Sequence, residues 1–435
     1  METKLWQKPT LQNPQWLEDF TIGNDRLLDL LLAEHDVTAS MAHANMLAKS
    51  GLIGDDENLL LQAELKNILH SVKSGFFVID PNVEDVHSQI EFLLTKKLGD
   101  VGKKIHTARS RNDQVLTAIK LFIKAELKNT AQHVKVLFDL LQTLSEKHKQ
   151  VILPGYTHMQ IAMPSSFGLW FGAYAESLSD DMELLLAAYK VTDKNPLGSG
   201  AGYGSSLPID RSSTTEEMGF ASMNHNVVYA QMTRGKTEKI AAIALAGIAS
   251  TLAKLSMDVC LFLSQNFNFI SFPEELTTGS SIMPHKKNPD VFELIRAKCN
   301  KLQALPNELA LLTSNLSSGY HRDFQLTKES LFPSFQILND CLKGATHSLQ
   351  QISVKRNITD DEKYQYIFSV EKVNDLVKKG IPFREAYKQV GAEIQNGEFL
   401  FEGKVSHSHE GSMGNPMTEE IRNEFYNKLE QLGIA

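Results

Sequence analysis

The chain has few cysteines, and none is placed for a metal site or a disulfide framework. Its 435 residues contain only Cys260, Cys299 and Cys341. Few, odd-numbered and widely spaced cysteines in a long chain indicate a reducing compartment. The segment HSHE places His407 close to His409, but no third ligand is nearby and no His-x-x-x-His helix is present. We therefore expect no metal site.

An excess of positive charge is also missing. Lys and Arg number 44 against 52 Asp and Glu, a net charge of −8, which argues against a general binder of nucleic acid or anionic membranes. The first residues, METKLWQKPT, lack the apolar core of a secretory signal. The most apolar run, residues 240–257, is rich in Ala and interrupted by Lys254, so a buried bundle helix is favoured over a membrane span. The sequence predicts a cytoplasmic protein without a nucleic-acid or membrane partner.

No nucleotide-binding fingerprint is complete. The stretch LGSGAGYGSS, residues 197–206, has Tyr203 where the dinucleotide motif requires Gly. It also lacks the Gly-Lys-Ser/Thr of a P-loop. A mobile turn is favoured over a phosphate cradle, and we expect no cofactor.

What the sequence does contain is helical periodicity. Between residues 113 and 149 apolar side chains recur at steps of three and four, without Gly or Pro, over much more than a typical helix length. Similar stretches occupy residues 165–190, 226–265 and 289–313. Strand-like alternation is scarce. Because long helices usually pack side by side, the sequence predicts an all-α fold with a long central helical bundle.

Turn-rich segments at residues 153–164 and 195–211 separate these helices, and we expect loops there. The sequence pattern changes near residues 351–360, which indicates that a smaller C-terminal unit begins there. This unit ends in a predicted helix at 418–432. We predict an N-terminal domain, a central bundle domain and a C-terminal domain, spanning residues 1–112, 113–355 and 356–435.

The segment TTGSSIMPHKKNPDVFE, residues 277–293, combines a Gly-Ser-Ser loop with positive charge before a predicted helix. Asn288 suits the N-cap position and Pro289 the first helical position. Loop amides and the helix dipole favour an anion at such a start, and Lys286 or Lys287 would add a full charge. The alternative is an ordinary turn with two solvated lysines.

A second helix start has the same character. The segment KKIHTARSRNDQV, residues 103–115, places Ser110, Arg111, Asn112 and Asp113 before the longest predicted helix, where Asp also caps well. A simple capping turn is the alternative. Two cationic, hydroxyl-rich helix starts in an acidic chain nevertheless favour an anionic ligand. By contrast, a single histidine such as the one in GYTHMQIAMP is more often structural than catalytic.

Taken together, these segments resemble the argininosuccinate lyases of the fumarase/aspartase superfamily. GSSIMPHKKNP is similar to the superfamily signature, and HTARSRNDQV, PGYTHMQ, PLGSGAGYG, GYHRDFQLTKE and KKGIPFREAYKQVG followed by HSHEGSMGN narrow the resemblance. They occur in the family's order from about residue 20 to 415. The resemblance implies a homotetramer whose active sites each draw on three subunits. It also implies reversible cleavage of argininosuccinate to arginine and fumarate, in arginine biosynthesis.

The resemblance also implies catalytic roles. Ser280 matches the general base, and Lys286 and Asn288 match the groups that hold the substrate carboxylate. His158 matches a histidine proposed to assist proton transfer, and Glu293 matches the carboxylate paired with it. Elimination of this kind passes through a carbanion whose charge spreads into a carboxylate, which explains why cations gather around the loop.

Binding roles follow in the same way. The positions that match binders of the fumarate portion are Ser110, Arg111, Asn112 and Thr157. Those that match the arginine side are Thr21, Asp25, Tyr320, Gln325 and Lys328. His87 matches a histidine in the family's DVHSQIE region.

The sequence departs from the family pattern at several positions. Thr21 stands where serine is common, Ala108 where glycine is common and Tyr387 where histidine is common. These departures concern substrate affinity more than the type of reaction. The alternatives are another fumarate-releasing lyase, acting on adenylosuccinate or aspartate, and a structural relative without activity.

Overall fold

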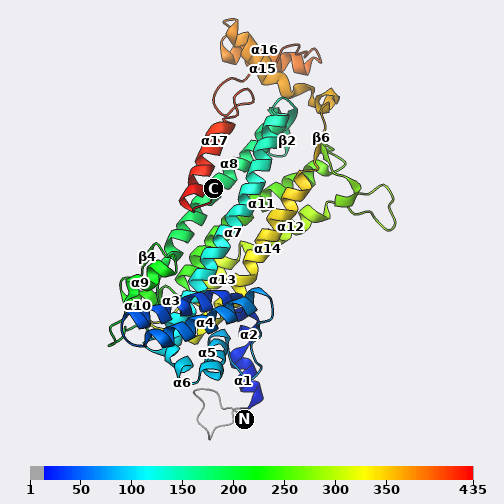
Figure 1. The fold of residues 1–435 in the computed structure, drawn as a ribbon. Coiled ribbons are helices and arrows are strands. Elements are labelled where there is room, and N and C mark those ends of the chain that lie inside the picture. The colour runs from blue at the N-terminus through cyan, green and yellow to red at the C-terminus, as the bar shows by residue number, and fades with distance from the viewer. Residues whose placement is uncertain (1–13, 435) are drawn as a thin grey trace. The chain divides into compact units, whose positions relative to one another are not determined.

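The computed structural model describes residues 14–434, and it confirms the predicted helical bundle (Figure 1). Four helices are much longer than the others, and segments of them run side by side. They are α7 (Arg111–His148), α8 (Phe167–Thr192), α11 (Lys236–Leu263) and α14 (Leu326–Leu349). Helix α11 is long and apolar enough to cross a membrane by length and composition alone, but 61% of its most apolar window is buried inside the protein.

Two of the predicted helices are each divided. The stretch 226–265 forms α10 (Val227–Met232) and α11, separated at Gly235, whose φ of 75° is left-handed. A Cβ atom there would lie 2.6 Å from Thr313, so the break needs a glycine. The stretch 289–313 likewise forms α12 (Asp290–Leu302) and α13 (Leu305–Leu312).

The chain forms two compact units, each built from segments distant in sequence. Of the described residues, the first comprises 14–130, 184–246 and 302–337. Besides parts of the long helices, its helices are α1 (Gln15–Ile22), α2 (Asp25–Leu28), η1 (Asp29–Leu32), α3 (Ala33–Lys49), α4 (Asp55–Lys73), α5 (Val86–Leu98), α6 (Asp100–Lys103), η2 (Lys104–His106), α9 (Arg211–Glu217), α10, α13 and η4 (Arg322–Gln325). The strands β3 (Lys194–Asn195) and β4 (Ser222–Met223) pair in parallel.

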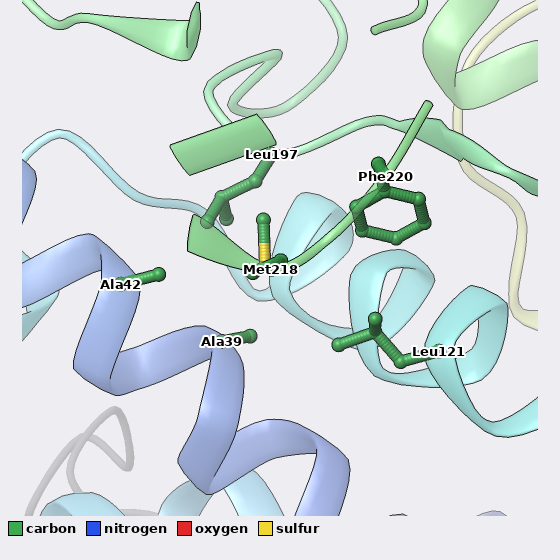
Figure 2. Close-up of a cluster of buried hydrophobic side chains, with 6 residues drawn as sticks. All are labelled: Ala39, Ala42, Leu121, Leu197, Met218 and Phe220. Atoms are coloured by element: carbon green, nitrogen blue, oxygen red, sulfur yellow. The ribbon is translucent and has the colours of Figure 1, made fainter. Parts of the chain in front are cut away.

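A buried apolar cluster fixes the start of α7 in the first unit (Figure 2). It joins Ala39 and Ala42 of α3, Leu121 of α7, and a segment after β3 that contributes Leu197, Met218 and Phe220. Because the alanine side chains are small, α3 packs closely against α7 and the segment that contains Leu197. The Gly-rich stretch that begins beside Leu197 is therefore anchored next to the first turns of α7.

The second unit comprises residues 131–183, 247–301 and 338–435. In addition to parts of the long helices and α12, it contains the strands β1 (Ile152–Thr157), β2 (Gln160–Ser166), β5 (Ile270–Ser271) and β6 (Ser353–Val354), and the helices η3 (Glu274–Leu276), η5 (Ile358–Asp360), η6 (Glu362–Phe368), α15 (Ser369–Lys378), α16 (Phe383–Gln395) and α17 (Thr418–Gln431). Strand β5 pairs antiparallel with β6.

Aromatic and polar contacts hold the second unit together. Phe138 of α7 stacks on Phe425 of α17 with ring centroids 3.8 Å apart and planes nearly parallel. Trp170 and Tyr174 of α8 both donate hydrogen bonds to Asp258 of α11, at 3.1 and 2.6 Å. These contacts confirm that the apolar stripes predicted on the long helices face their neighbours.

The prediction of a loop at residues 153–164 was wrong, because this segment lies in a β-hairpin. Strand β1 pairs antiparallel with β2, from Ile152 opposite Ser166 to Thr157 opposite Gln160. The two residues at its tip, His158 and Met159, have left-handed φ values of 52° and 60°. This is the backbone geometry of a two-residue hairpin turn, which usually carries Asn-Gly. The three-domain boundaries predicted from sequence stay a prediction.

Candidate active site

Side-chain hydrogen bonds cap the start of α7 at Ser110. The Ser110 hydroxyl oxygen accepts the backbone N–H of Asn112 at 3.2 Å, and the Asp113 carboxylate accepts the N–H of Ser110 at 3.0 Å. This reciprocal pattern satisfies amides that have no partner inside the helix. The Ser110 hydroxyl proton is left to donate elsewhere, as a binder of an anion needs. Asp113 is the third residue of α7, so it supports the helix start by accepting the N–H of Ser110 and is not itself the cap that precedes the helix.

Arg111 is held at this helix start by α5. Its guanidinium lies 2.9 Å from the Asp85 carboxylate and donates to the Ser88 hydroxyl at 2.7 Å. Asp85 also caps α5 by accepting the N–H of Ser88 at 2.8 Å. Burial alone would raise the pKa of Asp85, but the charges of His87 and Arg111 outweigh burial and lower it. Arg111 is therefore positioned by ionised partners rather than free in solvent.

Behind these residues lies a buried ionic network centred on His87. The His87 ring nitrogen Nδ1 is 3.1 Å from the Asp36 carboxylate, and both side chains are almost completely buried. Burial would lower the pKa of His87, but the charge and hydrogen bond of Asp36 outweigh it and raise the pKa. Gln114 of α7 donates to the same carboxylate at 2.9 Å. His87 thus supports the helix start from within the protein.

A cavity of about 650 Å³ opens beside this network, within the first unit. Among its lining residues are Ser88, Ser110, Arg111 and Arg322. Its walls combine hydroxyl donors and the guanidinium groups of arginines, which suit a carboxylate ligand, with the carboxylates of Glu84 and Glu91. The prediction that this helix start binds an anion is thus consistent with the geometry.

Predicted arginine-side residues lie in the same unit, around a buried ion pair. The Lys328 ammonium lies 2.7 Å from the carboxylates of both Asp25 and Asp29. Burial would lower the pKa of Lys328, but the two negative charges outweigh it and raise the pKa. Burial raises the pKa of Asp25 to about 6, against the opposing charge of Lys328. Lys328 therefore holds Asp25 in place.

Gln325 and Thr21, two further residues predicted on the arginine side, are joined by a hydrogen bond. Gln325 donates to the backbone carbonyls of Thr21 and Ile22, both at 3.0 Å. The Thr21 hydroxyl donates to the carbonyl of Leu17 at 2.8 Å, which leaves its oxygen free to accept. Tyr320 is 41% exposed on the preceding segment.

Sequence reasoning missed Asp29, Glu84 and Arg322 in this part of the site. Arg322 donates to the Glu84 carboxylate at 2.9 Å and to the Thr21 carbonyl at 2.8 Å. One signal was present in the sequence: Asp29 follows Asp25 by four residues, a spacing that places both on one helical face. Arg322 stands inside the quoted segment GYHRDFQLTKE, but nothing local indicates Glu84 as its partner.

In the second unit, the loop of residues 277–289 is closed at its base. The backbone N–H of Asn288 donates to the Thr278 carbonyl at 2.8 Å, and the N–H of Thr278 donates back to the Asn288 carbonyl at 3.2 Å. Lys287 pairs with Glu274 at 3.0 Å. Helix α12 begins at Asp290, so Asn288 precedes the helix instead of capping it. The predicted cap was wrong because the Asn288 backbone pairs with Thr278.

Within this loop the Ser280 hydroxyl faces two amides. Its oxygen accepts the N–H groups of Met283 and Ile282, at 3.1 and 3.3 Å. Donors aimed at one oxygen favour its negatively charged form. A cavity of about 690 Å³ in the second unit is lined by Lys286, Asn288 and Glu293, among others. The loop and the start of α12 therefore bring Lys286, Asn288 and Glu293 to one cavity, whose lining does not include Ser280.

The structure places Thr157 and His158 apart from that cavity. Both are exposed at the tip of the β1–β2 hairpin. Glu293 lies 4.0 Å from Arg296 of its own helix, and among the described residues no hydrogen bond joins it to His158. The predicted pairing of His158 with Glu293 stays a prediction within a single chain.

Among residues 14–434, no group of three or more His, Cys, Asp or Glu side chains is placed to hold a metal ion. His407, from the HSHE segment, is instead 2.9 Å from the Glu371 carboxylate. This contact gives the first histidine of the segment a structural partner within the second unit.

Comparisons with known proteins identify the class. The sequence profile of a family described as Lyase matches residues 10–304. Two solved structures share the fold, an EDDS lyase in complex with formate (TM-score 0.77, 18% identity, 97% of this chain and 90% of that one) and a class II fumarase from Schistosoma mansoni (TM-score 0.69, 16% identity, 95% of each chain). The chain therefore belongs to this lyase family, and it is an enzyme of that class.

Two relatives define its place within the family. An argininosuccinate lyase of Phocaeicola vulgatus is 58% identical over 97% of this chain and 94% of its own length. An argininosuccinate lyase of Thermotoga neapolitana is 41% identical over 90% of this chain and 98% of its own length. The chain is a member of the argininosuccinate lyases, as its sequence motifs predict.

Proposed function

We propose that this lyase cleaves argininosuccinate reversibly to arginine and fumarate, a reaction of arginine biosynthesis. The observation that carries the proposal is the similarity, along nearly the whole chain, to relatives named argininosuccinate lyase. The site chemistry supports it, since one unit holds acidic groups for a guanidinium and the other a cationic loop for a carboxylate. No cofactor is part of the proposed reaction.

The reaction begins when Ser280 removes a proton from the carbon beside a substrate carboxylate. A serine is a weak base unless its alkoxide is stabilised. The two amides that donate to its oxygen support this role. Closure of the loop over the substrate would exclude water and strengthen those interactions.

The carbanion that forms is stabilised by Lys286 and Asn288. Its charge spreads into the neighbouring carboxylate, which becomes doubly negative, and preorganised donors aimed at this developing charge give the largest catalytic contribution. Both residues line the cavity beneath the loop, which supports the assignment.

The carbon–nitrogen bond then breaks, and the departing guanidino nitrogen takes a proton. We assign the donor as His158, oriented by Glu293. Thr157 binds the substrate beside it. Because His158 and Glu293 do not meet within one chain, we place their pairing in an assembly of subunits.

The remaining residues bind the two halves of the substrate. Ser110, Arg111 and Asn112 hold the fumarate portion at the start of α7, where Ser110 and Arg111 line the cavity together with Arg109 and Arg322. The arginine portion lies against Thr21, Asp25, Tyr320, Gln325 and Lys328. Asp25 supplies the negative charge, and Lys328 keeps it in position.

We further propose that the active enzyme is a cytoplasmic homotetramer in which each site draws on three subunits. Such an assembly explains why the predicted site residues are divided between two units of the chain. Its other partners are the substrate and products alone.

The proposed function is tested by fumarate release, followed by ultraviolet absorbance. Argininosuccinate, adenylosuccinate and aspartate are supplied in separate reactions. Rapid release from argininosuccinate alone is the expected result. Fumarate release from adenylosuccinate or aspartate would show that the protein is a different lyase. A folded protein that releases no fumarate from any of the three would be a structural relative without activity.

A further inference from the structure

One buried carboxylate joins two of the sequence motifs in the first unit. Asp113 is completely buried. Its Oδ2 atom accepts the backbone N–H groups of Gly198 at 2.9 Å and Gly200 at 2.8 Å. Its other oxygen accepts the N–H of Ser110 at 3.0 Å. A single side chain therefore ties the Gly-rich loop to the start of α7.

The glycines are needed for this arrangement. Gly198 and Gly200 have left-handed φ values of 84° and 59°, and their N–H groups converge on one point. A Cβ atom on Gly198 would lie 2.8 Å from Arg211, and one on Gly200 would lie 3.0 Å from the Gly204 carbonyl. The loop thus has the geometry of an anion cradle, and the anion it holds is the chain's own carboxylate.

A second buried side chain holds the loop from α10. The amide nitrogen of Gln231 donates to the Ser199 hydroxyl at 3.0 Å and to the Gly200 carbonyl at 3.3 Å. Gln231 and Ser199 are both buried. Asp113 accepts two N–H groups of the loop, and Gln231 donates to a hydroxyl and a carbonyl of it, so α7 and α10 both hold the loop.

We propose that Asp113 is a positioning residue for substrate binding. It fixes the backbone of Ser110 and the Gly-rich loop as one body, so that the donors of Ser110 and Arg111 face the cavity at a constant position. Asp113 itself does not touch the substrate, since it is fully buried. This inference rests on the proposed function, in which Ser110, Arg111 and Asn112 bind the fumarate portion.

The test is Asp113→Asn, which keeps the shape of the side chain. The amide nitrogen cannot accept a hydrogen bond, so the variant keeps either the Ser110 contact or the two glycine contacts. We expect the KM for argininosuccinate to rise about tenfold with kcat changed by less than about threefold. Hydrogen exchange should accelerate by about tenfold or more at whichever amides lose their acceptor, either that of Ser110 or those of Gly198 and Gly200.

The matched control is Asp193→Asn in the same unit. Asp193 is also buried, and it accepts the N–H of Ala221 at 3.1 Å and pairs with Lys124 at 2.6 Å, away from the cavity. This variant should lose stability without a change in KM. Equal KM values for the two variants, or unchanged exchange at all three amides of Ser110, Gly198 and Gly200 in Asp113→Asn, would overturn the proposal.

A measurement on the unaltered enzyme covers the case in which Asp113→Asn does not fold. The amides of Ser110, Gly198 and Gly200 should exchange with a common, strong protection. Free exchange at the two glycines beside a protected Ser110 would overturn the inference. A wild-type enzyme that is inactive on argininosuccinate would instead overturn the proposed function, and with it the binding role given to residues 110–112.

Discussion

At the scale of single residues, burial determines how the charged groups of the site behave. Lys328 lies between Asp25 and Asp29, and its positive charge offsets the free-energy cost of burying the two carboxylates. The Asp25 carboxylate is nevertheless buried enough for its pKa to rise to about 6. A group that ionises near neutrality links substrate binding to pH.

We expect kcat/KM for argininosuccinate to fall as the pH is lowered through about 6. Above that pH Asp25 is ionised and attracts the guanidinium group; below it Asp25 is protonated and the attraction is lost. The measurement is the pH profile of kcat/KM for the wild type and for Asp25→Asn. The variant should be less active at pH 8, and its kcat/KM should not show the fall near pH 6, which we call the step.

A control for this profile is Asp181→Asn in the second unit. Burial raises the pKa of Asp181 to about 6 as well, but this residue contacts Thr251 and has no proposed role in binding. Its variant should keep the wild-type step in kcat/KM. Loss of the step in Asp181→Asn, or its persistence in Asp25→Asn, would refute the assignment to Asp25.

The proposed base makes a second prediction at this scale. Ser280→Ala should reduce turnover by about a thousandfold or more while the Kd for argininosuccinate stays within a few-fold of wild type. Fumarate absorbance gives the turnover, and calorimetric titration gives the Kd. Ser281→Ala, the neighbouring exposed serine, is the control and should remain active. Near-normal turnover in Ser280→Ala would exclude it as the base.

At the scale of elements, amphipathic periodicity predicts the long helices within a few residues. The stretch 113–149 corresponds to α7, whose observed bounds are Arg111–His148. The hairpin at residues 152–166 was not predictable, because its turn uses His158 and Met159 where Asn-Gly is usual. The break at Gly235 was also missed, since an isolated glycine within a helical pattern is often tolerated.

The same contrast holds for the candidate site. Motif resemblance named Ser110, Asp25 and Lys328 without any structure. It did not identify Asp29 or Glu84, because their partners are more than 200 residues away in sequence. Only folding brings these carboxylates to Lys328 and Arg322.

The packing of α17 supplies a prediction for element stability. Phe425→Ala should lower the free energy of unfolding by about 3–5 kcal/mol, since this buried ring stacks on Phe138. Denaturant unfolding followed by circular dichroism measures the loss. Phe383→Ala on α16 is the control, because Phe383 is half exposed and its loss should cost far less. Equal losses would show that the stacking contributes little.

At the scale of the whole molecule, the proposed site residues are divided between two units. The first unit holds Asn112 together with the arginine-side residues, and the second holds Ser280 with the rest of its loop. A site built from several subunits would reunite them. Variants defective in different units would then complement each other in a mixed assembly.

We therefore expect Asn112→Ala and Ser280→Ala, each nearly inactive alone, to regain activity when co-expressed. Mixed tetramers would contain some sites in which both residues are intact. The measurements are fumarate release by the co-purified protein and its mass by sedimentation. Mixing Ser280→Ala with Lys286→Ala is the control, since both changes lie in the same loop and no intact copy of it forms. An active monomer, or no recovery in the first mixture, would contradict the shared site.

The closed base of the 277–289 loop has a consequence for enzyme engineering. Because Thr278 and Asn288 are paired through their backbones, the distance between the loop's two ends is fixed independently of the side chains between them. The entropy of closing a loop grows only slowly with its length. The segment between these residues is thus a cassette that can be exchanged for that of another superfamily member, so that reactivity is redesigned while the supporting helices are left unchanged.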